Sequence, residues 1–307
     1  MLTSFFGKSN PVNFVLVGSY MLLVGLGHFL LGDRGAFSFL DLGMLLGVIT
    51  GLIFSMLILD FVIRKNAITL LNTFGVFLFS CAVGMIPSVY FEPEVVVANL
   101  FILLAVRRIF SLQSSKNTEA KILDASLWIG IASLFYFWSI LLLLVLFAAI
   151  FLMPQKSFRH YLIPFVGWVG LLLIVSAYQL VMTQTFGWWS EWWTPISFDF
   201  SSYASWKLWV VITLLLVLLV WSLASKLADI SSGPRKERPT KVVQLFLVVA
   251  TFLMVLVSAE KNGAELLFLL APFSMMVAAY VQKPNDRWFK ELILWCFVLA
   301  PIVFLAT

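Results

Sequence analysis

Long apolar runs separated by short polar connections make up most of this 307-residue sequence. A run of about 20 mainly apolar residues is what an α-helix needs to cross the hydrocarbon core of a membrane. Runs that each predict one such helix cover residues 13–31, 37–63, 69–90, 95–110, 161–183, 206–225, 242–259, 265–281 and 289–306. The pattern therefore predicts an all-α protein, a bundle of transmembrane helices.

One further run, residues 122–153, is long for one span and short for two. The distribution of basic residues distinguishes these cases, because cytoplasmic loops are enriched in Lys and Arg. If the chain reverses near Phe137, 17 of the 20 basic residues fall on one side of the membrane, whereas a single crossing divides them 9 to 11. The reversal is favoured and gives spans at 122–136 and 139–153. A re-entrant break at Phe135–Trp138 is the alternative.

The resulting topology has about 11 spans in a single integral membrane domain covering residues 1–307. The N-terminus is predicted to be cytoplasmic and the C-terminus periplasmic, in a bacterial inner membrane. Only Arg34, Lys207 and Lys261 lie on the periplasmic side among the basic residues.

Composition agrees with this class, since 62% of the residues are apolar and 11% are charged. Soluble domains have about 45–50% apolar and about 25% charged residues. A cytosolic enzyme and a nucleic-acid-binding module are therefore excluded, although the net charge is +5. The sequence has no metal-ligand spacing and no nucleotide-binding motif. No metal or cofactor is predicted, and the lipid bilayer is the first expected partner.

The strongest candidate for chemistry is the predicted outer turn Ser258–Leu266. It places Glu260, Lys261 and Glu265 within a few residues. Glu265 precedes Pro272 by seven residues, about two helical turns, so it shares a face with the kink that this proline is expected to cause. Ionisable side chains that face a bundle interior are functional candidates. We predict Glu265 and Glu260 as catalytic residues.

Two other outer connections contribute further polar residues. The first contains Asp33 and Arg34, and the second contains Glu92 and Glu94. If the loops converge, they form an acidic pocket with three cations, Arg34, Lys207 and Lys261. Cations that hold an anionic lipid-linked substrate, beside a carboxylate base, would suit group transfer. Asp33 is the third predicted catalytic residue, and the remaining acids and cations are predicted to bind substrate.

The loop at residues 184–206 is rich in tryptophan. Trp189, Trp192 and Trp193 could stack on sugar rings, and we predict them as substrate-binding residues. An aromatic belt at the level of the lipid headgroups explains the same enrichment without a substrate.

Gly43, Gly47 and Gly51 recur at every fourth position of the second predicted span. Such a stripe lies on one helix face and allows a neighbouring backbone to approach closely. It predicts a packing face for another helix, either of this chain or of another envelope membrane protein.

Three segments carry a resemblance to known sequences: the opening residues 1–14 (MLTSFFGKSNPVNF), residues 125–136 (ASLWIGIASLFY) and residues 260–272. Together they resemble an uncharacterised family of polytopic inner-membrane proteins of Bacteroidota, over the whole chain. More loosely, the layout resembles the GT-C class of membrane glycosyltransferases and polymerases.

The GT-C resemblance implies an outward-facing site and a polyprenyl-phosphate donor. Asp33 stands where a catalytic acid of the first outer loop would be, and Glu92 or Glu94 where a second-loop acid would be. The sequence departs from that class because it has no large soluble domain and no adjacent acidic pair in the first outer loop.

These observations favour a transferase or polymerase that acts on a lipid-linked saccharide at the periplasmic face. A non-catalytic scaffold subunit of a larger envelope complex is one alternative. A lipid or solute transport component is another, although few ionisable residues lie near the predicted membrane centre.

Overall fold

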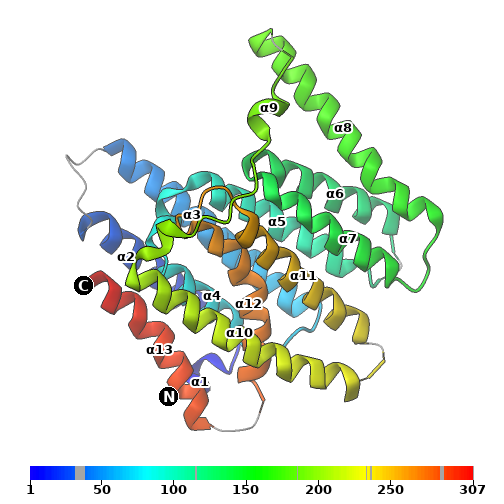
Figure 1. The fold of residues 1–307 in the computed structure, drawn as a ribbon. Coiled ribbons are helices and arrows are strands. Elements are labelled where there is room, and N and C mark those ends of the chain that lie inside the picture. The colour runs from blue at the N-terminus through cyan, green and yellow to red at the C-terminus, as the bar shows by residue number, and fades with distance from the viewer. Residues whose placement is uncertain are drawn as a thin grey trace. The chain divides into compact units, whose positions relative to one another are not determined.

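The computed structural model describes residues 1–31, 39–114, 116–184, 186–232, 234–235, 237–283 and 287–306. Regular structure in these residues is helical throughout, so the predicted all-α fold is confirmed (Figure 1). The chain forms two compact units. Unit 1 comprises residues 1–96, 199–232 and 261–307, and unit 2 comprises residues 97–198 and 233–260.

Unit 1 is assembled from three separate stretches of sequence. Its α-helices are α1 (Leu2–Phe6), α2 (Pro11–Leu31), α3 (Phe39–Lys65), α4 (Phe74–Gly84), α10 (Trp206–Ser232), α12 (Leu267–Val281) and α13 (Arg287–Ala306). Short 3₁₀ turns join them at η1 (Pro87–Phe91), η3 (Ser201–Ala204) and η4 (Ala264–Leu266).

The core of unit 1 consists of α4 and α12, which pack against each other. All 11 residues of α4 are buried, and α2, α3 and α13 also contact this helix. The segment Ala264–Val281, which includes α12, is 89% buried. Both helices are apolar on all sides, as expected for helices surrounded by other helices.

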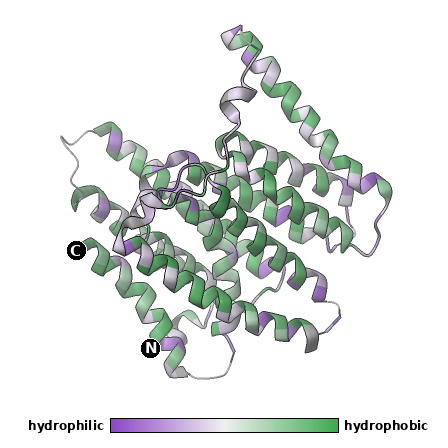
Figure 2. Cartoon of the chain, in the orientation of Figure 1, coloured by the Kyte–Doolittle hydropathy of each residue, from purple (hydrophilic) through white to green (hydrophobic). Residues whose placement is uncertain are grey.

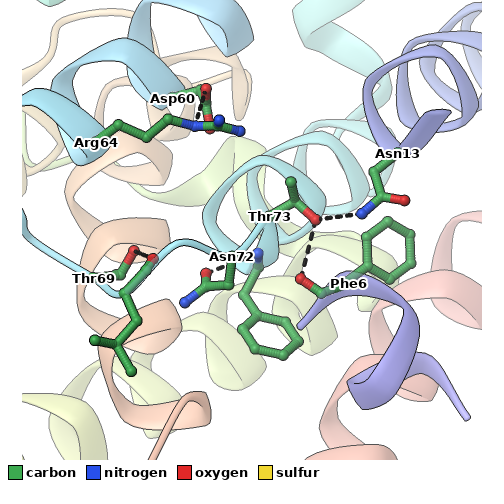
Figure 3. Close-up of polar contacts among 9 residues, drawn as sticks. Phe6, Asn13, Asp60, Arg64, Thr69, Asn72 and Thr73 are labelled. Carbon is green, nitrogen blue, oxygen red and sulfur yellow. Dashed lines mark hydrogen bonds and ion pairs between the residues drawn. The ribbon is translucent and has the colours of Figure 1, made fainter. Parts of the chain in front are cut away.

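A polar network fixes the N-terminal helix α1 to this core (Figure 3). The hydroxyl of Thr73 donates to the carbonyl of Phe6 at 3.1 Å and accepts from the side-chain amide of Asn13 at 2.8 Å. On the α13 side, the carboxylate of Glu291 accepts the backbone N–H groups of Leu2 and Thr3 at 3.1 and 3.0 Å. These bonds satisfy buried polar groups and hold α1 in place.

Unit 2 contains α6 (Thr118–Phe135), η2 (Phe137–Leu141), α7 (Leu142–Phe151), α8 (Phe158–Thr183), α9 (Trp189–Trp192) and α11 (Arg238–Val257). Helix α5 (Pro93–Ser111) begins in unit 1 and lies mostly in unit 2. The helix α6 packs against α7 and α8, and α7 packs against α11. Helix α8 is largely exposed within the chain, because only 11% of its apolar window is buried.

The predicted break in the run 122–153 is confirmed at Tyr136. This residue is extended, with φ −144° and ψ 101°, between the end of α6 and the start of η2. Because α6 and α7 contact each other side by side, the chain turns back after Tyr136 and does not continue as one long helix.

Helices correspond to every predicted span. Seven of the described helices are long and apolar enough to cross a membrane. They are α2, α3, α8, α10, α11, α12 with η4, and α13. The other four predicted spans correspond to α4 with η1, to α5, to α6, and to η2 with α7. Figure 2 shows apolar residues along the helices and hydrophilic residues concentrated near their ends and in loops. The total of 11 spans and the orientation stay predictions.

Candidate functional site

The candidate site in unit 1 is built on the turn through which the chain enters α12. Gly263 adopts a positive φ of +95°, and a Cβ atom there would lie 3.0 Å from Leu208 Cδ2 and 3.3 Å from Ser88 Oγ. The left-handed backbone conformation favours glycine, and a Cβ atom there would also make a tight contact with Leu208. The side-chain oxygen of Asn262 accepts the backbone N–H of Ala264 at 2.9 Å. This bond fixes the turn immediately before Glu265.

Glu265 points into unit 1, where only 1% of its surface is exposed. One carboxylate oxygen accepts the backbone N–H of Gly263 at 2.9 Å, and the other accepts the hydroxyl hydrogen of Tyr203. Tyr203 is itself 5% exposed and belongs to η3. A buried carboxylate requires such donors, because water no longer solvates it.

Lys261 provides a positive charge near this carboxylate, and only 4% of its surface is exposed. Its ammonium nitrogen lies 4.6 Å from the centroid of the Phe200 ring, within cation–π range. Burial lowers the pKa of Lys261, while the charges of Glu265 and Asp199 oppose this effect. Asp199 is exposed, and its pKa is lowered because its carboxylate accepts the backbone N–H of Ser201 at 2.9 Å.

A second connection, between α4 and α5, joins the same site through Glu92. The side-chain amide of Asn262 donates to Glu92 Oε1 at 2.8 Å. We use the name Glu265 cluster for Glu265, Tyr203, Lys261, Asn262 and Glu92. These residues come from three separate parts of the sequence and gather at the N-terminal end of α12.

Other residues predicted for the site lie elsewhere. Glu94 is exposed, at the start of α5. Lys207 donates from its ammonium group to the carbonyl of Phe304 at 3.1 Å, near the C-terminal end of α13. Glu260 is exposed and belongs to unit 2. Asp33 and Arg34 lie outside the described residues.

The predicted tryptophans lie in unit 2. The indole of Trp192 donates to the carbonyl of Ser133 at 2.6 Å, and its ring packs against Phe137 with centroids 4.9 Å apart. Trp189 and Trp193 are 46% and 62% exposed. Trp192 therefore anchors the loop, while Trp189 and Trp193 offer indole surfaces to lipid or to a ligand.

The glycine stripe of α3 is open at two positions. A Cβ atom at Gly43 or Gly47 would have no neighbouring atom within 4 Å. Both glycines are exposed. This part of the stripe is not used for packing by the described residues of the chain.

Tyr203 is the member of the cluster that sequence reasoning missed. It lies in the loop at 184–206, whose tryptophans dominate the pattern. A signal was present, because Tyr203 lies four residues after Asp199 in a connection predicted to face the same side as Glu265. The pairing itself depends on how that loop folds over α12.

The arrangement offers a proton acceptor, a phenolic hydroxyl and an ammonium group in one cluster. These are groups that proton transfer and anion binding require. No group of three or more His, Cys, Asp or Glu side chains among the described residues could hold a metal ion.

The long apolar helices and the extensive apolar surface identify a polytopic, α-helical membrane protein that associates with the lipid bilayer. The chain belongs to the family of unknown function DUF6427, whose model matches residues 6–307. No curated protein and no solved structure matches the chain.

Proposed function

We propose that this protein is a transferase of the bacterial inner membrane that acts on a lipid-linked saccharide at its periplasmic face. The observation that carries the proposal is the buried carboxylate of Glu265, bonded to Tyr203 and near the ammonium group of Lys261. An ionisable cluster inside a helical bundle is costly to bury, which favours a functional role.

Each group of the cluster has a chemical role in this proposal. Tyr203 holds the carboxylate of Glu265 in position until substrate binds, and Glu265 then accepts the proton of the attacking sugar hydroxyl. Lys261 balances the negative charge of a lipid phosphate as it leaves. Glu92 accepts hydrogen bonds from sugar hydroxyls, and the side-chain amide of Asn262 donates hydrogen bonds to them. In unit 2, the exposed indoles of Trp189 and Trp193 are suited to stacking on sugar rings.

Access to the carboxylate requires a local movement. Glu265 and Tyr203 are both buried, and Tyr203 occupies one of the two carboxylate oxygens. A substrate hydroxyl therefore has to replace the Tyr203 hydroxyl, which requires the η3 turn to shift away from α12. The exposed residues of this turn, Ser201 and Ser202, would allow such a shift.

The test is mass spectrometry of polyprenyl-linked lipids from cells that lack the protein. Complementation with the wild type is expected to restore the lipid-linked glycan profile, whereas Glu265→Gln is expected to leave a truncated glycan. Glu119→Gln, at an exposed position of the first turn of α6, is the matched control and should restore the profile. A profile that does not change in cells lacking the protein would refute the proposal.

A second candidate function is a scaffold subunit of an envelope complex. It is favoured by the open surface at Gly43 and Gly47, where a partner helix could approach closely. In that case a partner should co-purify in fixed ratio, and Gly47→Leu should release it. A monodisperse monomer from mild detergent would argue against this function.

A further inference from the structure

A cavity with several polar side chains in its lining lies in unit 1, at the other end of α12 from Glu265. Its volume is about 750 Å³, and its lining includes Thr3, Asn72, Gln282, Lys283, Trp288 and Lys290. Glu265 and Lys283 are 18 residues apart along a nearly continuous helix, which corresponds to about 27 Å. By the predicted topology, this cavity faces the cytoplasm.

The side-chain oxygen of Gln282 is fixed by two hydrogen bonds from the segment that precedes α4. Its side-chain oxygen accepts the backbone N–H of Leu70 at 2.7 Å and the side-chain amide of Asn72 at 3.1 Å. A backbone N–H can only donate, so the oxygen of Gln282 must be on this side. The two donors of its NH₂ group take no part in these bonds, and Gln282 lines the cavity.

Lys283 supplies a cation at the same place. Its ammonium group donates to Ser225 Oγ at 2.6 Å and forms an ion pair with Asp229, whose two carboxylate oxygens lie at 2.9 and 2.8 Å. An ammonium group has three donors, and 32% of this side chain is exposed. Ser225 and Asp229 hold the ammonium group at the cavity, and the exposed part of the side chain leaves it open to an added anionic ligand. The carboxylate of Glu291, which also lines the cavity, is engaged by the backbone N–H groups of α1.

An apolar groove on α10 leads to this lysine. The groove has a volume of about 670 Å³ and is lined by Leu216, Val217, Val220, Trp221, Ala224 and Ser225. Ser225 is the residue that bonds Lys283. The ring of Trp221 lies 6.4 Å from that of Tyr280 and 6.1 Å from that of Phe289, so the groove rests on α12 and α13.

We propose that the cavity and the groove together form a binding site for one anionic phospholipid. The phosphate accepts hydrogen bonds from Lys283 and Gln282, and an acyl chain lies along α10 from Ser225 towards Leu216. Apolar walls that end in cationic and amide donors match an amphiphile with a negative headgroup. The site does not depend on the proposed transferase activity, because its residues lie at the opposite end of α12.

The test uses the full chain purified in detergent and native mass spectrometry to count bound lipid. The wild type is expected to retain one phosphatidylglycerol and no phosphatidylcholine. Lys283→Gln should weaken retention about tenfold, because it removes a charge-assisted bond. Lys283→Arg should keep most of it. Ala224→Phe, on the exposed face of α10, should weaken retention while leaving the lysine intact.

Lys156→Gln, which changes an exposed lysine of unit 2, is the matched control and should bind as the wild type does. Inorganic phosphate should not displace the lipid, because it gains nothing from the groove. The proposal is overturned if phosphatidylcholine is retained equally, if phosphate alone displaces the lipid, or if Lys283→Gln and Ala224→Phe both bind at the wild-type level.

Discussion

Replacement of Glu265 is the most informative perturbation of the candidate site. Its carboxylate accepts two hydrogen bonds, from Tyr203 and from the backbone of Gly263, in a fully buried position. Hydrogen bonds to charged groups contribute about 1.5–3 kcal/mol each, and neutral ones about 0.5–1.5 kcal/mol. Glu265→Ala leaves two buried donors without acceptors and also creates a cavity. We expect it to lower the free energy of unfolding by about 4 kcal/mol.

Glu265→Gln should cost far less stability. The amide oxygen can accept the N–H of Gly263, while the amide nitrogen donates to the phenolic oxygen of Tyr203. Two charge-assisted bonds become neutral ones, but the cost of burying a charge disappears. The expected loss is at most about 2 kcal/mol. A loss of activity in Glu265→Gln would therefore report chemistry and not unfolding.

The measurement is SDS-induced unfolding of the purified protein, followed by tryptophan fluorescence. A double-mutant cycle with Tyr203→Phe should give a coupling energy of about 1–2 kcal/mol between Tyr203 and Glu265, because the phenol loses its charged partner in one variant. Equal costs for the alanine and glutamine variants would refute this reasoning. A coupling energy near zero would do so as well.

Three other predictions concern the turn, the surface and the topology. Gly263→Ala should lower the free energy of unfolding by about 1–3 kcal/mol in the same assay, because it combines a left-handed backbone with a tight contact. Asp124→Asn should change it by less than about 1 kcal/mol, since the 2.8 Å ion pair with Arg108 is about one-third exposed at both side chains. Reporters inserted after Asn117 and after Gln155 should both be cytoplasmic, whereas reporters on opposite sides would show that the chain crosses only once between them.

The long helices could be predicted from the sequence because each is an apolar run, whereas the short helices α1 and α9 were not predicted. The break near Phe137 was predicted from the charge distribution, and the structure has it at Tyr136. Asp60 and Arg64, spaced one helical turn apart, form an ion pair at 2.7 Å (Figure 3), which is a contact of the kind that spacing along one helix specifies.

Contacts between distant segments could not be predicted in the same way. Lys261 and Glu265 are close in sequence, so their proximity followed from spacing. Tyr203 reaches Glu265 only because η3 folds over the start of α12. The cavity at Lys283 likewise requires α1, the segment before α4 and α13 to meet, and no periodicity within one helix specifies such a meeting.

The burial of α4 has a consequence for how the protein is made. Its main packing partner, α12, begins at Leu267, 183 residues after α4 ends at Gly84. At a synthesis rate of about 5–20 residues per second, roughly 10 to 40 seconds separate the synthesis of α4 from that of α12. During that time the whole of unit 2 is synthesised, while unit 1 lacks α12, one of the two helices of its core. Nascent chains that stop before α12 would therefore expose α4 to lipid or to quality-control proteases, and unit 1 can complete its assembly only after most of the chain has left the ribosome.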